Sequence, residues 1–92
     1  MSTPTQAAVA RMLREVTGED EAWAAAIGPA TRLDGDLFLD SLELAALAGR
    51  LAAAFGPRVD LAAHVAGLRF EALLELSVAD VASYVDSTCG PR

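Results

Sequence analysis

The fold is decided by residues 36–44, which read Asp36-Leu37-Phe38-Leu39-Asp40-Ser41-Leu42-Glu43-Leu44. Aspartate and serine favour the start of a helix, because their side chains accept hydrogen bonds from backbone N–H groups that the first turn leaves free. From here apolar side chains recur at helical spacing, as Leu44, Leu47, Leu51 and Phe55. Gly56-Pro57 then ends the pattern. We therefore expect a helix that begins near Ser41 and buries Leu47 and Phe55.

Upstream, a first helix is predicted from Thr3 to Gly18. Thr3 and Gln6 have capping-box spacing, and the apolar residues of one face are Val9, Met12, Leu13 and Val16. A long connection follows to Asp40, with a short turn of helix expected at residues 23–27, where Trp23 anchors the segment. Connections of this length in a small domain are often functional. Side chains expected to hold this one on the core are Leu33, Leu37 and Leu39.

Downstream, three further helices are predicted. Asp60 has the position of a cap for a short helix through Val65, and a second short helix is indicated by Phe70, Leu73 and Leu74. Ser77 and Asp80 have capping spacing for a last helix that ends at Gly90-Pro91. Its inward face would be Val78, Val81 and Val85. No segment shows sustained alternation of apolar and polar residues, so the fold class is all-α.

The composition narrows the classes of function. The chain has 92 residues, which predicts a single domain over residues 1–92 with a core at about 5–87. Its net charge is −6, and a basic face for nucleic acid is absent. No apolar run is long enough for a membrane span, and no signal peptide is visible. One cysteine, Cys89, suits a reducing cytoplasm and is expected to be a free thiol without a role. The start at Met1 and the short tails favour a free-standing protein.

The step Asp40-Ser41-Leu42, at a helix start after a long loop, resembles the attachment site of acyl carrier and peptidyl carrier proteins. The resemblance runs from about Val9 to Val85. It implies a small four-helix bundle with a long first loop. Because residues 57–76 are longer than the usual link to the last helix, an extra short helix is expected there. The resemblance also implies that this segment borders the arm and shapes the choice of partner or cargo.

The resemblance also implies a function. Ser41 would receive 4′-phosphopantetheine from coenzyme A, transferred by a phosphopantetheinyl transferase. The thiol of this arm would carry thioester-bound intermediates, with acyl and aminoacyl cargo both open. The other partners would be a loading enzyme for the acyl or aminoacyl group and downstream synthase or tailoring enzymes, and the chain would be a monomer.

Four residues around Ser41 are predicted to contact partner enzymes. Asp36, Asp40 and Glu43 would meet basic patches, as the resemblance also implies. Leu42 should project outward beside the attachment point. For Glu43, a simple role as a favourable acid in the first helical turn is an equally good interpretation.

Two departures from the family stand out. Phe38 occupies a position where the family usually has glycine. We expect it to pack into the core under the loop, and the alternative is that it lines the base of the arm. The outward face of the same helix is smooth, formed by Leu42, Ala45, Ala46, Gly49 and Ala53. Fatty-acid carriers place further acids there, so a polyketide or nonribosomal peptide pathway is favoured.

Catalysis by the chain itself is not expected. A serine hydroxyl needs a base or a metal to become a nucleophile, and the sequence suggests no metal cluster. The single histidine, His64, has no acid–base partner in the sequence and should be solvent-facing or partly packed. The alternative to a carrier is a carrier-like helical module that binds a partner without a prosthetic group, in which Ser41 is merely a helix cap.

Overall fold

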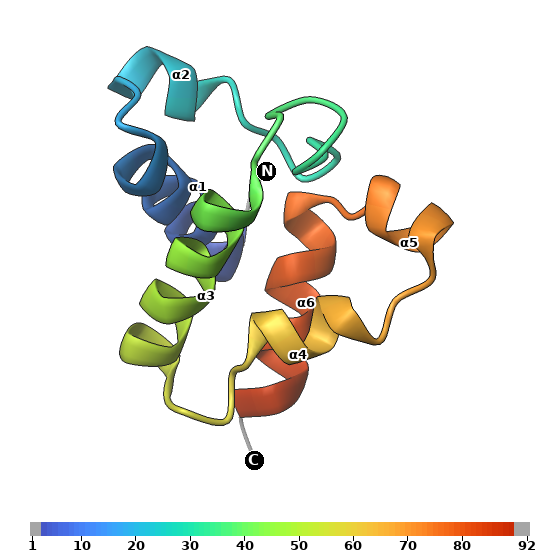
Figure 1. Ribbon diagram of the computed structural model, residues 1–92. Helices are drawn as coiled ribbons and strands as arrows, with labels where there is room; N and C mark the ends of the chain where they lie inside the picture. The colour runs from blue at the N-terminus through green and yellow to red at the C-terminus, as the bar shows by residue number, and fades with distance from the viewer. Residues whose placement is uncertain (1–2, 90–92) are drawn as a thin grey trace.

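The computed structural model describes residues 3–89, which fold into a bundle of helices (Figure 1). The helices are α1 (Pro4–Thr17), α2 (Glu21–Ala25), α3 (Ser41–Phe55), α4 (Leu61–Ala66), α5 (Phe70–Leu74) and α6 (Val78–Cys89). Within the described residues there is no strand, only an isolated bridge between Arg32 and Ser77. The predicted all-α bundle is confirmed, and α5 is the expected extra short helix before the last one. No helix within residues 3–89 is long and apolar enough to cross a membrane.

Helix α1 has the boundaries that its sequence predicts. The Thr3 hydroxyl accepts a hydrogen bond from the Gln6 N–H at 3.1 Å, and the Gln6 side chain accepts one from the Thr3 N–H at 3.2 Å. Gly18 ends the helix with a φ of 75°, a left-handed conformation that glycine adopts without steric cost. Of the predicted inward face, Val9, Met12 and Leu13 are buried and Val16 is half-buried.

Helix α3 lies beside α1, and α1 also packs on α6 (Figure 1). The predicted stripe of α3 faces this junction. Leu47 and Leu51 are fully buried, whereas Phe55 is only half-buried, so the expectation of a buried Phe55 is wrong in degree. Phe55 is the last residue of α3, and the chain leaves the core at Gly56. The core is formed by Val9, Met12, Leu13, Leu33, Leu47, Leu51, Val59, Leu61, Leu76, Val78, Val81 and Val85.

The long connection between α1 and α3 is tied to the start of α6. The Leu33 N–H donates to the Leu76 carbonyl at 3.0 Å, and the Val78 N–H donates to the Thr31 carbonyl at 2.9 Å. Leu33 is buried, and the side chains that pack on the core from the same connection are Trp23, Ile27, Leu37 and Leu39. The expected anchoring is therefore confirmed. The short helix begins two residues earlier than predicted, because the Asp20 carboxylate caps it by accepting from the Trp23 N–H at 2.9 Å.

Phe38 does not pack into the core, and this expectation is wrong. Its side chain is 79% exposed, and its φ is 56°. Leu37 and Leu39 take the positions that face the core, so the residue between them points to solvent. The left-handed backbone also explains why a glycine would suit this position.

The last three helices start at the predicted residues. The Asp60 carboxylate accepts from the Ala63 N–H at 3.0 Å, and the Ser77 hydroxyl accepts from the Asp80 N–H at 3.2 Å. The predicted inward valines of α6 are all buried. Gly90 and Pro91, expected to end this helix, lie outside the described residues, as does the side chain of Cys89.

Candidate functional site

Asp40, not Ser41, caps the N-terminus of α3. The Asp40 carboxylate accepts a hydrogen bond from the Glu43 N–H at 2.8 Å. The Glu43 carboxylate accepts one from the Asp40 N–H at 3.1 Å, which completes a capping box. The interpretation of Ser41 as the cap is therefore wrong, because its neighbour already satisfies the free N–H group.

The Ser41 side chain is left available. Ser41 is the first residue of α3 and is exposed. Its hydroxyl makes no hydrogen bond with any part of residues 3–89, and the N–H groups of Ser41 and Leu42 are also free there. An exposed hydroxyl on the first turn of a long helix is a fixed point to which a group can be attached.

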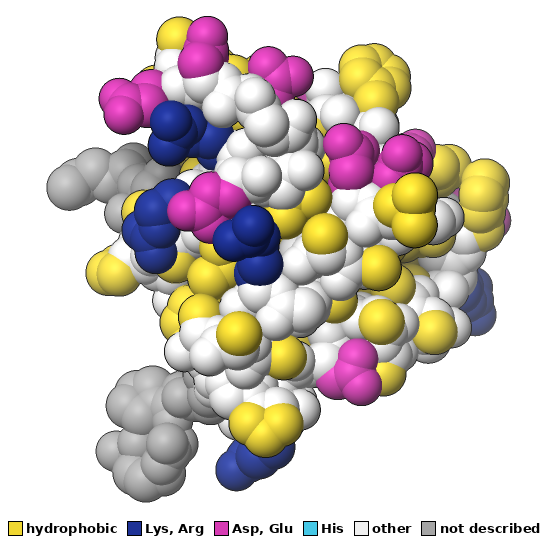
Figure 2. Space-filling view, turned by 60° about the vertical axis from the view of Figure 1, so that its left-hand side comes forward, with side chains coloured by type: hydrophobic (Ala, Val, Ile, Leu, Met, Phe, Trp, Pro, Cys, Tyr) yellow, Lys and Arg dark blue, Asp and Glu magenta, His cyan; other side chains and the backbone are white. Residues whose placement is uncertain are grey.

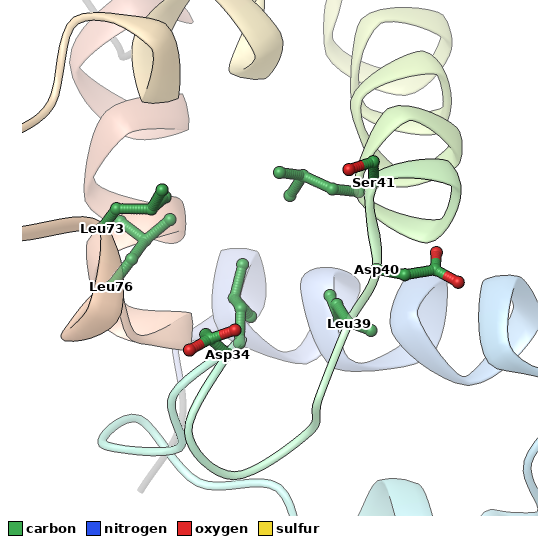
Figure 3. A pocket seen from close by; sticks show the side chains of 8 residues that line it. Asp34, Leu39, Asp40, Ser41, Leu73 and Leu76 are labelled. Carbon is green, nitrogen blue, oxygen red and sulfur yellow. The ribbon is translucent and has the colours of Figure 1, made fainter. Parts of the chain in front are cut away.

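A cavity of about 170 Å³ opens beside Ser41. Its walls come from the long connection, from α3, and from α5 and the residues after it. They are formed by Leu33, Asp34, Leu39, Asp40, Ser41, Leu44, Leu73 and Leu76. Figure 3 shows the Ser41 hydroxyl on the side of α3 that faces Leu73, whereas the Asp40 carboxylate points away from this space. The site is thus an apolar hollow with one hydroxyl at its edge.

Asp34 gives this hollow a charge. Its side chain lies among the leucines of the cavity wall (Figure 3). The Asp34 carboxylate makes no hydrogen bond or ion pair within the described residues. Asp34 is exposed, so its carboxylate is in contact with solvent at the rim of the hollow, where it can accept hydrogen bonds from a bound group.

Each acid predicted to meet partners also has a structural task. The Asp36 carboxylate accepts from the Arg32 N–H at 2.8 Å and lies 3.6 Å from the Arg32 Nε, so it holds the turn before α3. Asp40 and Glu43 form the capping box, and both interpretations of Glu43 remain compatible with its position. Leu42 is 81% exposed, as its outward placement requires.

Sequence reasoning did not name the residues that line the cavity opposite α3, although the resemblance placed the segment 57–76, which contains Leu73 and Leu76, beside the arm. Leu73 and Leu76 lie more than thirty positions from Ser41 in the chain, and Asp34 is a single acid in an irregular loop. The periodicity of apolar residues predicts which face of a helix is buried, but it does not predict which distant segments of the chain come into contact. No local pattern in the sequence would have grouped these residues.

His64 is partly packed, as expected. Its ring stacks on Tyr84, with the ring centres 4.2 Å apart and the planes 18° from parallel. The Tyr84 hydroxyl in turn accepts from the Asp60 N–H at 2.8 Å. His64 does not line the cavity beside Ser41, so it is not placed to activate that hydroxyl.

A comparison with known protein families matches residues 7–66 to the family described as the phosphopantetheine attachment site. The chain belongs to this family. The matched region runs from α1 through α4 and contains Ser41. Comparisons with curated proteins and with solved structures gave no match. Members of the family bear phosphopantetheine and carry groups for other enzymes, so this chain is a carrier and not an enzyme.

The residues at the start of α3 fit the prosthetic group of this family. A phosphodiester needs an accessible hydroxyl, which Ser41 provides. The free N–H groups of Ser41 and Leu42 lie at the positive end of the α3 dipole, and this end of a helix favours a bound phosphate. The adjoining cavity offers apolar surface to whatever follows the phosphate.

Proposed function

We propose that Ser41 is the residue to which phosphopantetheine is attached. The observation that carries this proposal is the exposed Ser41 hydroxyl, free of hydrogen bonds, at the first residue of α3 and at the edge of a cavity. Asp40 supports the assignment, because it caps the helix and leaves Ser41 without a structural task. The bound arm supplies a thiol that holds cargo as a thioester.

The attachment needs a separate enzyme. In the transfer, the Ser41 oxygen bonds to the phosphorus that bears the pantetheine, and the bond from that phosphorus to adenosine 3′,5′-bisphosphate breaks. The hydroxyl proton passes to a base of the transferase, since no side chain of residues 3–89 is hydrogen-bonded to Ser41. The chain contributes the oxygen, its fixed position on α3 and the acidic surface around it.

The cargo that we propose belongs to a polyketide or nonribosomal peptide pathway. The outward face of α3 supports this, because its exposed residues are Leu42, Ala45, Ala46, Gly49 and Ala53, without the acids of fatty-acid carriers. Figure 2 shows acidic side chains gathered toward the upper edge of this side of the molecule and a largely uncharged area below them. Asp34 adds support, because its exposed carboxylate at the rim of the cavity offers an acceptor to a cargo that donates hydrogen bonds, and offers nothing to a plain alkyl chain.

The partners follow from this assignment. A phosphopantetheinyl transferase acts first, then a loading enzyme for an acyl or aminoacyl group, then synthase or tailoring enzymes. Leu42 would contribute apolar contact, and Asp36, Asp40 and Glu43 would attract basic surfaces. We propose a single carrier domain over residues 1–92, with its core at about 5–87, acting as a monomer in the cytoplasm.

Incubation with coenzyme A, Mg²⁺ and a broad-specificity transferase tests the attachment. Intact-mass measurement should show one phosphopantetheine on the wild-type protein and on Ser83→Ala, a control at another exposed serine. The Ser41→Ala variant should gain no mass. A folded wild-type chain that never gains mass would favour the partner-binding module without a prosthetic group.

A further inference from the structure

An exposed aromatic ring lies three residues before Ser41. Phe38 is 79% exposed, and the other exposed large apolar side chains of the described residues are Leu42, Phe70 and Leu74. Its backbone adopts a left-handed φ of 56°, which glycine would adopt without cost. A glycine would therefore remove both a strained backbone and an exposed ring. The fold gains from neither feature, which points to a use outside the chain.

The segment that carries Phe38 is held rigidly. The Phe38 N–H donates to the Asp34 carbonyl at 3.1 Å, and the Leu39 N–H donates to the Leu33 carbonyl at 3.1 Å. Leu33 is itself buried and bonded through its N–H to Leu76. The ring is thus presented from a fixed backbone, so burying it against a partner would cost little ordering of the chain.

The charges near Phe38 decide which kind of partner fits. Residues 32–43 contain four acids, Asp34, Asp36, Asp40 and Glu43, against one arginine. That arginine, Arg32, already pairs with Asp36. A second copy of this chain would bring the same acids to face these, and like charges oppose such contact. The charge therefore selects a partner with an apolar socket bordered by basic side chains.

The position of Phe38 decides which partner this is. Loading, synthase and tailoring enzymes also approach this surface, but their chemistry takes place at the thiol, at the far end of the arm. Only the transferase must bring its reacting phosphorus to the Ser41 oxygen, and it must then cover the chain on either side of that residue. We propose that Phe38 is a specificity-determining contact residue for the transferase, inserted into an apolar socket with a basic rim. This inference rests on the proposed attachment to Ser41.

Steady-state kinetics of arm transfer test the contact. The probe is a broad-specificity phosphopantetheinyl transferase with coenzyme A and Mg²⁺, and the carrier concentration is varied. The variants are Phe38→Ala, Phe38→Gly and the matched control Phe70→Ala, which removes a ring that is 70% exposed on α5. Both Phe38 variants should raise the KM for the carrier about tenfold and leave kcat within about twofold, whereas Phe70→Ala should change neither.

Two further readouts separate docking from damage to the fold. Phe38→Gly should unfold at the wild-type temperature or above it, because glycine relieves the left-handed backbone. The KM ratio of Phe38→Ala to wild type should stay constant as salt rises, since an apolar contact is not screened.

The outcomes are distinct. A wild-type KM in both Phe38 variants overturns this inference alone, as does an equal loss in Phe70→Ala. A fall in kcat without a change in KM also overturns it, because Phe38 would then position Ser41 and not bind the partner. A wild-type chain that accepts no arm overturns the proposed attachment and this inference together.

Discussion

Ser41 and Asp40 are neighbours with separate tasks. Asp40 stabilises the start of α3 through its hydrogen bond to the Glu43 N–H, and Ser41 offers an unbonded hydroxyl. A residue without a structural task can be modified without disturbing the fold. Because the tasks are separate, a substitution of Asp40 should change the stability of the fold and a substitution of Ser41 should not.

We predict that Asp40→Ala lowers the free energy of unfolding by about 1 kcal/mol, the usual cost of losing a helix cap. Ser41→Ala should change it by no more than about 0.5 kcal/mol, since only an exposed hydroxyl is lost. Thermal or urea unfolding followed by circular dichroism measures both. A larger loss in Ser41→Ala than in Asp40→Ala would return the capping role to the serine.

A test of Glu43 requires a substitution that removes its negative charge but keeps its hydrogen bond in the capping box. Its carboxylate accepts the Asp40 N–H, so Glu43→Lys would break the capping box as well as reverse the charge. Glu43→Gln keeps an acceptor and removes only the charge. We expect Glu43→Gln to retain the wild-type unfolding temperature and to slow arm transfer about two- to fivefold at low salt, with the difference shrinking as salt rises. A rate equal to wild type at low salt would leave Glu43 with the capping role alone.

At the scale of elements, α3 joins the site to the core. Its first residue is Ser41, and its inward stripe includes the fully buried Leu47 and Leu51. The proposed attachment point is therefore held in place by the packing of this helix. The outward face is exposed along its length and is free to meet partners.

Leu47→Ala should lower the free energy of unfolding by about 2–5 kcal/mol, because it leaves a void in the core. Ala46→Ser, one position away on the exposed face, should change it by no more than about 0.5 kcal/mol. Chemical unfolding of the two variants compares them directly. Similar losses would indicate that α3 is rotated from the orientation described.

At the scale of the whole molecule, the sequence predicted the helices better than the site. Caps such as Thr3 with Gln6, and stops such as Gly18, act within one turn, so they can be recognised in a single sequence. The cavity depends on Leu33 meeting Leu76, a contact between distant segments that no local pattern encodes. The exposure of Phe38 was not predicted, because an aromatic side chain is expected to be buried. The left-handed backbone at this residue instead turns its side chain toward solvent.

The cavity as a whole yields a prediction about cargo. Asp34→Leu removes the carboxylate from the wall and leaves an apolar lining. Octanoyl-coenzyme A supplied to a broad transferase would place an alkyl cargo on the arm. The unfolding temperature should rise more on octanoylation in Asp34→Leu than in the wild-type protein, because the rim of the cavity then offers apolar surface in place of a solvated carboxylate. An equal rise in both would remove Asp34 from the choice of cargo.

The most direct test of the account is to map the modified residue. Trypsin cleavage after Arg32 and Arg50 releases residues 33–50, a peptide in which Ser41 is the only residue with a hydroxyl group. After incubation with coenzyme A and a transferase, tandem mass spectrometry should find phosphopantetheine on this peptide and on no other. Modification of a different peptide, or of the Ser41→Ala protein, would contradict the central claim that Ser41 carries the arm.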